Sequence, residues 1–331
     1  MSNPSKKVSK PRVFKPESSS KYESRSTKKK SETINTSFSS LKPTPPPTNN
    51  RISYPRITIN DFGSKIIKEK TILNVQNYKE FSKRYVSSLS TVYFVEDKRT
   101  HKRYAAKCSN RGMNEDEMIQ VLREIKILMK YQHPTIINFE GVSFIDLEGN
   151  DRITIFTEYA KNKSLANLIN MANKSLLPID FYETNWQIIL VGISYAMMML
   201  HQNNVINRDL KAENVLIDDK YRPRLVDFGL SKEFDPSNPY YQSCNPGTIQ
   251  YMAPEVFKDE QFSMKVDVYS FGILMYEVVN RKRAYLDIYI EKGKFKGDFY
   301  IQKHVTEDGL RPRFDDNIEI NENIKNLITQ C

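Results

Sequence analysis

The fold is decided by the stretch Val205-Ile206-Asn207-Arg208-Asp209-Leu210-Lys211-Ala212-Glu213-Asn214-Val215-Leu216-Ile217, which is followed by Asp227-Phe228-Gly229. The stretch contains a carboxylate at Asp209, a lysine two residues later and an amide at Asn214, and a second carboxylate follows at Asp227. Transfer of a phosphoryl group from a nucleotide needs a group that orients the hydroxyl nucleophile, a cation beside the phosphoryl group and oxygen ligands for Mg²⁺. The pattern therefore indicates phosphoryl transfer.

These motifs, in this order, resemble the signature of the eukaryotic protein kinase family. The resemblance covers about residues 78–331 and implies an α+β, bilobal, protein kinase-like fold. A small β-rich N-lobe with one main helix would span residues 78–157, and a larger α-helical C-lobe would span residues 158–331. The resemblance also implies ATP and Mg²⁺ as cofactors, and the wording around Asp267 favours the tyrosine-kinase-like branch of the family.

The resemblance assigns roles to the polar residues of the two motifs. Asp209 would be the catalytic base that orients the acceptor hydroxyl, and Lys211 would lie beside the transferred phosphoryl group. Asn214 and Asp227 would hold the metal ions. An earlier Asp61-Phe62-Gly63 repeats the second motif, but no catalytic loop precedes it, so we interpret it as a coincidence.

The nucleotide site would be completed by residues upstream. Lys107, at the end of Tyr104-Ala105-Ala106-Lys107, would bind the α- and β-phosphates, with Glu124 as its ion-pair partner. The hinge between the lobes would be Thr157, Glu158, Tyr159 and Ala160; its backbone would meet the adenine edge, with Thr157 as the gatekeeper. The side chains that would sandwich the adenine are Val92, Ala105 and Leu216, for which simple core packing is the alternative.

Substrate docking and regulation are predicted from the segment after Asp227. Gly247-Thr248 and Tyr251-Met252-Ala253-Pro254-Glu255 resemble the substrate-docking segment, so the activation loop would run from Asp227 to Glu255. Lys211 together with Thr248 is the serine/threonine-type pattern, which implies protein substrates with Ser or Thr acceptors. The remaining regulatory candidates are a basic pocket of Arg208 and Lys232 and a phosphorylation site at Ser243, with Tyr240 and Tyr241 as alternatives and an upstream activating kinase as a partner.

Hydrophobic periodicity agrees with the implied lobes. We expect strands over residues 90–95, 104–108, 138–144 and 153–159, and helices over residues 115–131, 188–201 and 266–279.

The sequence departs from the family pattern in three places. Tyr85, Ser87 and Ser90 stand where the family has the three glycines of its phosphate-covering loop, so side chains should hold that loop off the phosphates or bend it differently. Asn207 replaces a histidine that stacks under Phe228, and we expect a looser stack. The chain ends before the last helices of the family, which leaves Glu255 without its usual arginine and therefore partly buried and unpaired.

Composition places the rest of the chain. It has 331 residues, 39% of them hydrophobic, which is enough for a sizeable core. The three cysteines and four histidines are scattered and support neither a disulfide framework nor a tetrahedral metal site. No apolar run reaches the roughly 18 residues that span a bilayer, and Trp186–Leu200 is interpreted as a buried core helix. With no secretory signal evident, we expect a cytoplasmic location, with the nucleus as the alternative.

The net charge of +10 belongs to the N-terminal region. Residues 1–60 contain 13 of the 50 basic and 3 of the 40 acidic residues, which leaves 37 of each sign in residues 61–331. This segment is rich in Ser, Pro and Lys, and we predict a disordered basic tail, followed by a transitional linker over residues 61–77. The tail is interpreted as solvated and phosphorylatable; contact with nucleic acid or an acidic membrane is the alternative.

Two functions remain open at this point. The first is an ATP- and Mg²⁺-dependent protein serine/threonine kinase, because Lys107, Glu124, Asp209, Asn214 and Asp227 are all present. The alternative is a catalytically weak or inactive pseudokinase that acts as a nucleotide-binding or protein-interaction scaffold, which the glycine-free loop favours.

Overall fold

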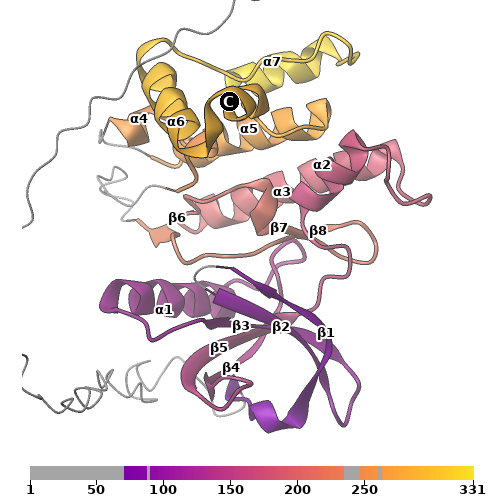
Figure 1. Ribbon diagram of the computed structural model, residues 1–331, viewed down its shortest axis with the longest axis vertical. Helices are drawn as coiled ribbons and strands as arrows, with labels where there is room; N and C mark the ends of the chain where they lie inside the picture. Colours follow the sequence, from indigo (N-terminus) through magenta and orange to yellow (C-terminus); the bar gives the residue numbers. More distant parts are fainter. Residues whose placement is uncertain (1–70, 88–89, 235–246, 259–262) are drawn as a thin grey trace, which may run out of the picture. The chain divides into compact units, whose positions relative to one another are not determined.

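The computed structural model describes residues 71–87, 90–234, 247–258 and 263–331. The predicted tail over residues 1–60, residues 61–70 of the predicted linker, and Ser243 lie outside the described residues. Within the described part a sheet with one long helix precedes a larger helical region, so the fold is α+β and bilobal, as the resemblance implied (Figure 1).

The small lobe is built on a five-stranded antiparallel sheet in the order β1-β2-β3-β5-β4. Its strands are β1 (Tyr78–Val86), β2 (Ser90–Asp97), β3 (Arg103–Ser109), β4 (Phe139–Ile145) and β5 (Asp151–Glu158). Side chains alternate between the two faces. On β2 and β3 four buried residues, Tyr93, Val95, Ala106 and Cys108, form a hydrophobic cluster with Phe156, while the residues between them lie on the opposite face, from which Lys107 contacts Asp227. A pocket lies next to this second face and is lined by residues that include Lys107, Glu124 and Asp227. We refer to it as the cleft.

Helix α1 (Glu115–Lys130) lies beside the sheet of the small lobe (Figure 1). It begins with a capping box: the Asn114 side chain accepts the Glu117 N–H at 2.8 Å, and the Glu117 carboxylate accepts the Asn114 N–H at 3.0 Å. Its inner side buries Ile125 and Leu128, and Glu124 is buried with them. The helix therefore holds the Glu124 carboxylate in a fixed position next to β3.

The large lobe is mainly helical. Its helices are α2 (Leu165–Asn173), α3 (Glu183–Gln202), α4 (Pro254–Phe257), α5 (Lys265–Asn280), α6 (Leu286–Glu307) and α7 (Glu322–Gln330). Helix α3 buries one side, including Ile189, Ile193 and Leu200, and α5 is buried along most of its length. No helix among the described residues is long and apolar enough to span a bilayer.

Short elements between α3 and α5 carry the predicted motifs. Strand β6 (Val205–Ile206) pairs with β9 (Lys232–Glu233), and β7 (Val215–Ile217) pairs with β8 (Pro223–Leu225). Two 3₁₀ helices, η4 (Ala212–Asn214) and η5 (Ile249–Tyr251), also lie in this stretch, whereas η3 (Val75–Asn77) precedes β1. The catalytic-loop motif thus runs from β6 to β7, and Asp227 follows two residues after the end of β8.

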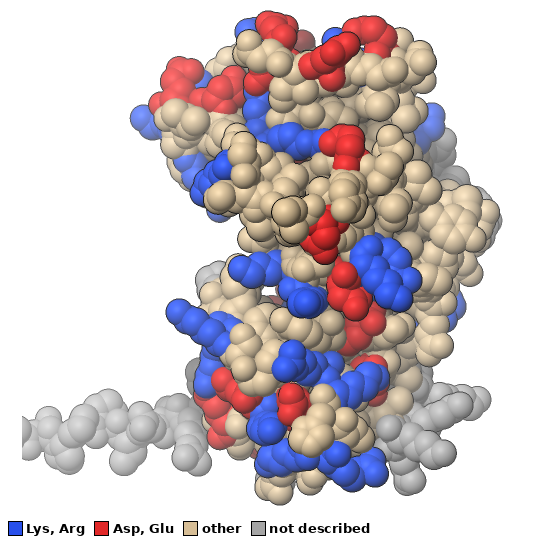
Figure 2. Space-filling view, turned by 90° about the vertical axis from the view of Figure 1, so that its right-hand side faces the viewer, with Lys and Arg blue, Asp and Glu red and all other residues tan. Residues whose placement is uncertain are grey.

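All seven predicted strands and helices are present, with ends that differ from the prediction by a few residues. Residues 71–77, which fall in the predicted linker, already contact the sheet, because the Leu73 N–H donates to the Val142 carbonyl at 2.7 Å. Acidic and basic side chains are interspersed over the face shown in Figure 2, in keeping with the balanced charge of residues 61–331.

Candidate active site

The catalytic-loop backbone is held by a buried carboxylate of α5. Asp267 is 1% exposed; one of its oxygens accepts the Asn207 N–H and the other accepts the Arg208 N–H, each at 2.8 Å. His201 of α3 contacts the same carboxylate at 2.8 Å. Because a buried charge is stable only when its hydrogen bonds are satisfied, these contacts fix the start of the loop relative to two core helices.

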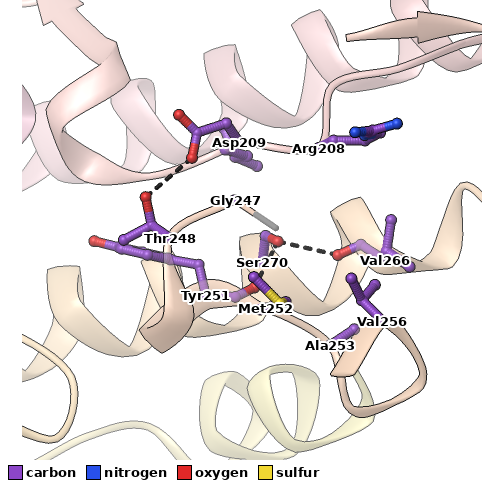
Figure 3. Close-up of a pocket in the computed structure, with 11 residues that line it drawn as sticks. Arg208, Asp209, Gly247, Thr248, Tyr251, Met252, Ala253, Val256, Val266 and Ser270 are labelled. Atoms are coloured by element: carbon purple, nitrogen blue, oxygen red, sulfur yellow. Dashed lines mark hydrogen bonds between the residues drawn. The ribbon is translucent and has the colours of Figure 1, made fainter. Parts of the chain in front are cut away.

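Asp209 lies at the centre of a polar cluster. Its Oδ2 accepts hydrogen bonds from Lys211 Nζ at 2.6 Å and from Asn214 Nδ2 at 2.8 Å. Its Oδ1 accepts the Thr248 hydroxyl at 3.0 Å, a contact that Figure 3 shows across the space between two segments. Lys211 Nζ also donates to Thr248 Oγ1 at 3.0 Å. The four predicted residues are therefore brought together around one carboxylate that is only 9% exposed.

The docking segment lies directly against the catalytic loop at Gly247. A Cβ at this position would be 2.6 Å from the Arg208 carbonyl oxygen, so only glycine permits the approach. The cavity next to this contact is lined by Asp209 and Thr248 at its polar end and by Met252, Val256 and other apolar residues beyond them (Figure 3).

A second buried carboxylate, Glu277 of α5, supports the docking segment. It is 1% exposed and accepts the Tyr251 hydroxyl at 2.5 Å and the Ala284 N–H at 2.9 Å. The Tyr251 oxygen in turn accepts the Ala212 N–H at 3.4 Å, so the network reaches the catalytic loop. Burial raises the pKa of Glu277 to about 7. Glu255, the residue predicted to be unpaired, is half-buried and forms no ion pair with any described residue.

A second polar cluster joins the two lobes. Lys107 Nζ lies 3.0 Å from Glu124 Oε2 and 3.2 Å from Asp227 Oδ1. Burial opposes the charge of Lys107, but Glu124 and Asp227 more than compensate and raise its pKa above the ordinary value. The same lysine is the main reason that the pKa of Asp227 is lowered. Asp227 is therefore ionised at neutral pH, as a metal ligand must be.

Asn214 and Asp227 are adjacent and offer oxygen donors. The Val226 N–H donates to the Asn214 carbonyl at 2.9 Å, which brings the residue after Val226 close to η4. The Asn214 amide nitrogen is used by Asp209, and no described residue donates to its Oδ1. No three His, Cys, Asp or Glu side chains converge in the described part, so an ion here would take further ligands from water or phosphate. Few protein oxygens with water and phosphate completing the shell is the usual arrangement for Mg²⁺.

The residues predicted to contact adenine come from both lobes. Val92 and Ala105 are on the sheet face opposite the core, and Leu216 of β7 is half-buried on the large-lobe side. Thr157 pairs with Ala105 across β3 and β5. The Glu158 N–H donates to the Asn138 carbonyl at 3.0 Å, so this part of the hinge backbone is already hydrogen-bonded within the small lobe.

Sequence reasoning missed an aromatic group at the hinge. The Tyr159 ring contacts the rings of Phe81 and Phe94 at centroid distances of 5.2 Å and 5.6 Å. Both contacts are edge-on, which is a favourable geometry for aromatic pairs. They tie the hinge to β1 and β2, and no short motif in the sequence signals them.

The glycine-free hairpin is closed by side chains. Ser87 Oγ donates to the Ser90 carbonyl at 2.9 Å and accepts the Ser90 N–H at 3.0 Å. Asn110, just beyond β3, donates to the Ser87 carbonyl at 2.7 Å and accepts the Thr91 hydroxyl at 2.5 Å. The described residues on either side of the hairpin tip are thus joined by the two serines and by Asn110. Tyr85, paired with Val92 on β2, is 64% exposed.

Asn207 has a role that the sequence did not predict. Its Oδ1 accepts the Asp209 N–H at 3.1 Å, and the Ser231 hydroxyl donates to its carbonyl at 3.1 Å. The residue is 1% exposed, and its Nδ2 has no hydrogen-bond partner among the described residues. Phe228 is fully buried. The asparagine therefore fixes the backbone N–H of Asp209, while its own Nδ2 is left unsatisfied among the described residues.

The predicted basic pocket contains a third cation. Lys232 has a lowered pKa, caused by burial and then by the nearby charges of Arg208 and Arg123. Arg123 of α1 donates to the Gly229 carbonyl at 2.8 Å, which holds the cluster against the start of the activation loop. Arg123 was missed, although its position directly before Glu124 could have indicated it. Ser243, the predicted phosphorylation site for this pocket, lies outside the described residues.

Comparisons with known proteins agree with this geometry. Residues 87–331 match the family described as "Protein kinase domain". The chain is 36% identical over 178 residues to cysteine-rich receptor-like protein kinase 41 of Arabidopsis thaliana, which covers 52% of this chain and 25% of that protein. It is 35% identical over 178 residues to cysteine-rich receptor-like protein kinase 44 of the same plant, with 52% and 44% covered.

A third relative is a G-type lectin S-receptor-like serine/threonine-protein kinase of Arabidopsis thaliana. It is 34% identical over 194 residues, which covers 56% of this chain and 22% of that protein. The chain thus spans less than half the length of these curated relatives.

Proposed function

The chain belongs to the protein kinase domain family, and on that premise we propose that it is an active ATP- and Mg²⁺-dependent protein serine/threonine kinase. The observation that carries the proposal is that the predicted site residues contact one another in two polar clusters. Lys107, Glu124 and Asp227 form one set of contacts, and Asp209, with its neighbours, forms the other. These contacts bring together the groups that phosphoryl transfer needs, namely a base, a phosphate-binding cation and a metal ligand.

Each cluster has its part in the mechanism. Bound Mg²⁺ would neutralise charge on the phosphates, and Asn214 and Asp227 would hold it. Lys107 would bind the α- and β-phosphates, kept in place by Glu124. The oxygen of the acceptor hydroxyl would bond to the γ-phosphorus while the bond between that phosphorus and the ADP oxygen breaks. Asp209 would accept the proton that the hydroxyl loses. Lys211, 2.6 Å from Asp209, would stabilise charge on the transferring group.

Specificity for Ser and Thr is supported by the contact between Lys211 and Thr248. Lys211 and Thr248 each donate a hydrogen bond to the Asp209 carboxylate, one to each oxygen, and so limit the space around it. A short acceptor side chain brings its hydroxyl to the carboxylate within this space. The printed name of one relative, a serine/threonine-protein kinase, supports the same acceptor class.

A weak or inactive pseudokinase is the second candidate. The serine-closed hairpin favours it, because backbone amides approach phosphate less closely when side chains intervene. The unsatisfied Asn207 amide also lowers the stability of the loop that carries Asp209. In this case the protein would bind nucleotide, or a partner, without transferring a phosphoryl group.

Transfer of radiolabelled γ-phosphate from ATP to a generic basic protein tests the proposal. The parent should label serine and threonine in the substrate, and Asp209→Asn should lower the rate about 10²- to 10⁴-fold because the base is lost. Asp219→Asn, in an exposed turn, is the matched control and should behave like the parent. Equal labelling by the parent and the Asp209 variant would contradict the assignment, and labelling of tyrosine would contradict the acceptor class.

When no labelling is found, a thermal-shift titration separates the two forms of the second candidate, one that binds nucleotide and one that does not. Stabilisation by ATP that requires Mg²⁺ would favour a nucleotide-binding pseudokinase. No stabilisation under either condition would leave a scaffold that does not bind nucleotide.

A further inference from the structure

An exposed corner interrupts α6 in the large lobe, on the side where α4 lies (Figure 1). At Gly293 the backbone leaves the helical region, with φ 71° and ψ 170°, so α6 consists of two helical segments. Only glycine adopts this φ without strain, and nothing lies within 4 Å of the place a Cβ would take. We refer to residues 290–299 as the α6 corner; it projects from the lobe.

Three large apolar side chains of the α6 corner face solvent. Ile290 is 76% exposed, Phe295 is 89% exposed and Phe299 is 68% exposed. Phe295 and Phe299 are four residues apart in one helical segment, so they lie on the same side of it. Grouped apolar side chains on a protein surface usually mark an interaction site.

The other side of this segment is anchored in the large lobe. Ile301 and Val305 are buried, at 0% and 3% exposure. Gly297 lies so close to the Tyr289 ring that a Cβ there would be 2.8 Å from Tyr289 Cδ1. The Tyr289 hydroxyl donates to the Asp298 carboxylate at 2.7 Å and so joins the two segments of α6. The backbone of the α6 corner is therefore fixed, and its aromatic side chains are presented in one orientation.

Two lysines flank the exposed aromatic side chain, in a stretch whose carboxylates are Glu291 and Asp298. Lys294 and Lys296 flank Phe295, and neither forms an ion pair with a described residue. The exposed carboxylate of the same stretch, Glu291, is paired with Lys292 at 2.8 Å. The α6 corner thus combines two available ammonium groups with a projecting phenylalanine.

We propose that the α6 corner docks on the surface of a membrane that contains anionic lipid. Phe295 and Phe299 enter the boundary between headgroups and acyl chains, while Lys294 and Lys296 remain among the anionic headgroups. A projecting side chain needs no complementary pocket in a fluid lipid interface, which favours lipid over a protein partner. Residues 1–60, which carry the net charge of +10, supply a second attraction of the same sign. Peripheral binding is stable when two such signals combine.

Vesicle cosedimentation of the full chain tests this docking. The chain should bind vesicles of phosphatidylcholine with phosphatidylserine, and should not bind phosphatidylcholine alone. Replacing both aromatic residues, Phe295→Ala with Phe299→Ala, should weaken binding at least about tenfold, because both lose apolar area that lipid would bury. Replacing both lysines, Lys294→Ala with Lys296→Ala, should weaken binding about tenfold and reduce its dependence on salt.

Matched controls are available elsewhere on the surface. Ile179→Ala removes an apolar side chain that is fully exposed in the loop before α3, and Lys220→Ala removes an exposed lysine between β7 and β8. Both should bind vesicles like the parent. The double aromatic variant should also keep the parent's activity on a soluble substrate and its thermal stability, because the two side chains lie at the surface.

Phe295→Trp reports insertion directly. Trp186 is the only tryptophan of the chain and is buried, so a change in emission on adding vesicles reports residue 295. We expect a blue shift with phosphatidylserine vesicles; unchanged emission would overturn the proposal. It would also be overturned if Lys28→Ala, Lys29→Ala and Lys30→Ala together abolished binding while the aromatic variant bound like the parent, since the tail would then act alone.

A chain that binds no vesicle also overturns the proposal and leaves a protein as the occupant of the α6 corner. These readouts need no phosphoryl transfer, so their failure is distinct from failure of the proposed kinase activity.

Discussion

The two sides of the nucleotide cleft are built on different principles. Around Asp209, side chains from the catalytic loop and the docking segment converge, with Lys211, Asn214 and Thr248 all hydrogen-bonded to one carboxylate. In the hairpin between β1 and β2, by contrast, Ser87 and Ser90 stand where the family has glycines and bond to each other. The first region keeps Asp209, Lys211, Asn214 and Thr248, although Asn207 replaces the family's histidine beside them, whereas the second keeps none of the glycines.

The contrast separates two kinds of requirement. A base, a metal ligand and a phosphate-binding cation act through particular atoms, which other residue types do not supply. A hairpin that covers phosphate acts through its backbone, and the backbone can be held in place by other means. Asn110, which bonds to Ser87 and Thr91, is such a means. Four changes, given from the largest expected effect to the smallest, test this separation.

The largest effect is expected at the metal site. Asp227→Asn removes the charge that Lys107 and an ion would share, and should lower the transfer rate about 10³-fold. The Mg²⁺-dependent part of the thermal stabilisation by ATP should disappear, while ADP without metal should still bind. If Mg²⁺ stabilised this variant as it does the parent, the Asp227 carboxylate would not be required for metal binding. The claim that the polar site depends on particular chemical groups would then be wrong.

A pH-dependent effect is expected at the carboxylate that supports the docking segment. Burial raises the pKa of Glu277 to about 7 from an ordinary value of 4.5, so folding takes up a proton between these values. Its contribution to the free energy of unfolding is therefore complete below about pH 4.5 and is lost as the pH rises through about 7, by about 3 kcal/mol in all. Urea unfolding at a series of pH values should show this fall.

Glu277→Gln is the matched variant for that measurement. The glutamine does not titrate, so the decrease in the free energy of unfolding over this range should be smaller than in the parent. An identical pH dependence in both proteins would mean that Glu277 does not carry the raised pKa.

A smaller effect is expected at the hairpin clamp. Asn110→Ala removes two hydrogen bonds to the hairpin and should raise the KM for ATP about three- to tenfold, with kcat little changed. Asn317→Ala, at an exposed position of the large lobe, is the control. A loss of kcat with unchanged KM would show that the clamp acts on the chemistry, and not on nucleotide binding as the comparison requires.

The smallest effect is expected from restoring one glycine. In Ser90→Gly the bond from Ser87 Oγ to the carbonyl of residue 90 is retained, so the KM for ATP should stay within about twofold of the parent. An improvement of tenfold or more would reverse the interpretation, because the serine side chain would then be an obstruction to the phosphates.

Local patterns predicted the elements of the fold well. The alternation of buried and half-exposed residues on β2 and β3 and the capping box of α1 depend on near neighbours, and all seven predicted elements are present. The site residues that lie in recognisable motifs were also brought together: Lys107 meets both Glu124 and Asp227. These residues could be named in advance because their chemistry limits each position to one or two residue types.

Other parts of the site carried no local signal. Asn110 and Ser87 are 23 residues apart, and Tyr251 and Glu277 are 26 apart; neither pair forms a motif. The change at Asn207 could be seen in the sequence, but its bond to the Asp209 N–H could not. Such contacts depend on how separate elements pack, so the residue type alone does not indicate them.

The sequence by itself determined which chemical groups the cleft contains and the order in which the chain supplies them, because a carboxylate, an ammonium group or an amide keeps its chemistry wherever it lies. Only the tertiary structure decided which of these groups meet, how the hairpin is closed without glycine, and that Glu277 is buried enough to have a pKa of about 7. The physical reason is that hydrogen-bond geometry and desolvation depend on the neighbours in space, which packing brings together from distant parts of the chain.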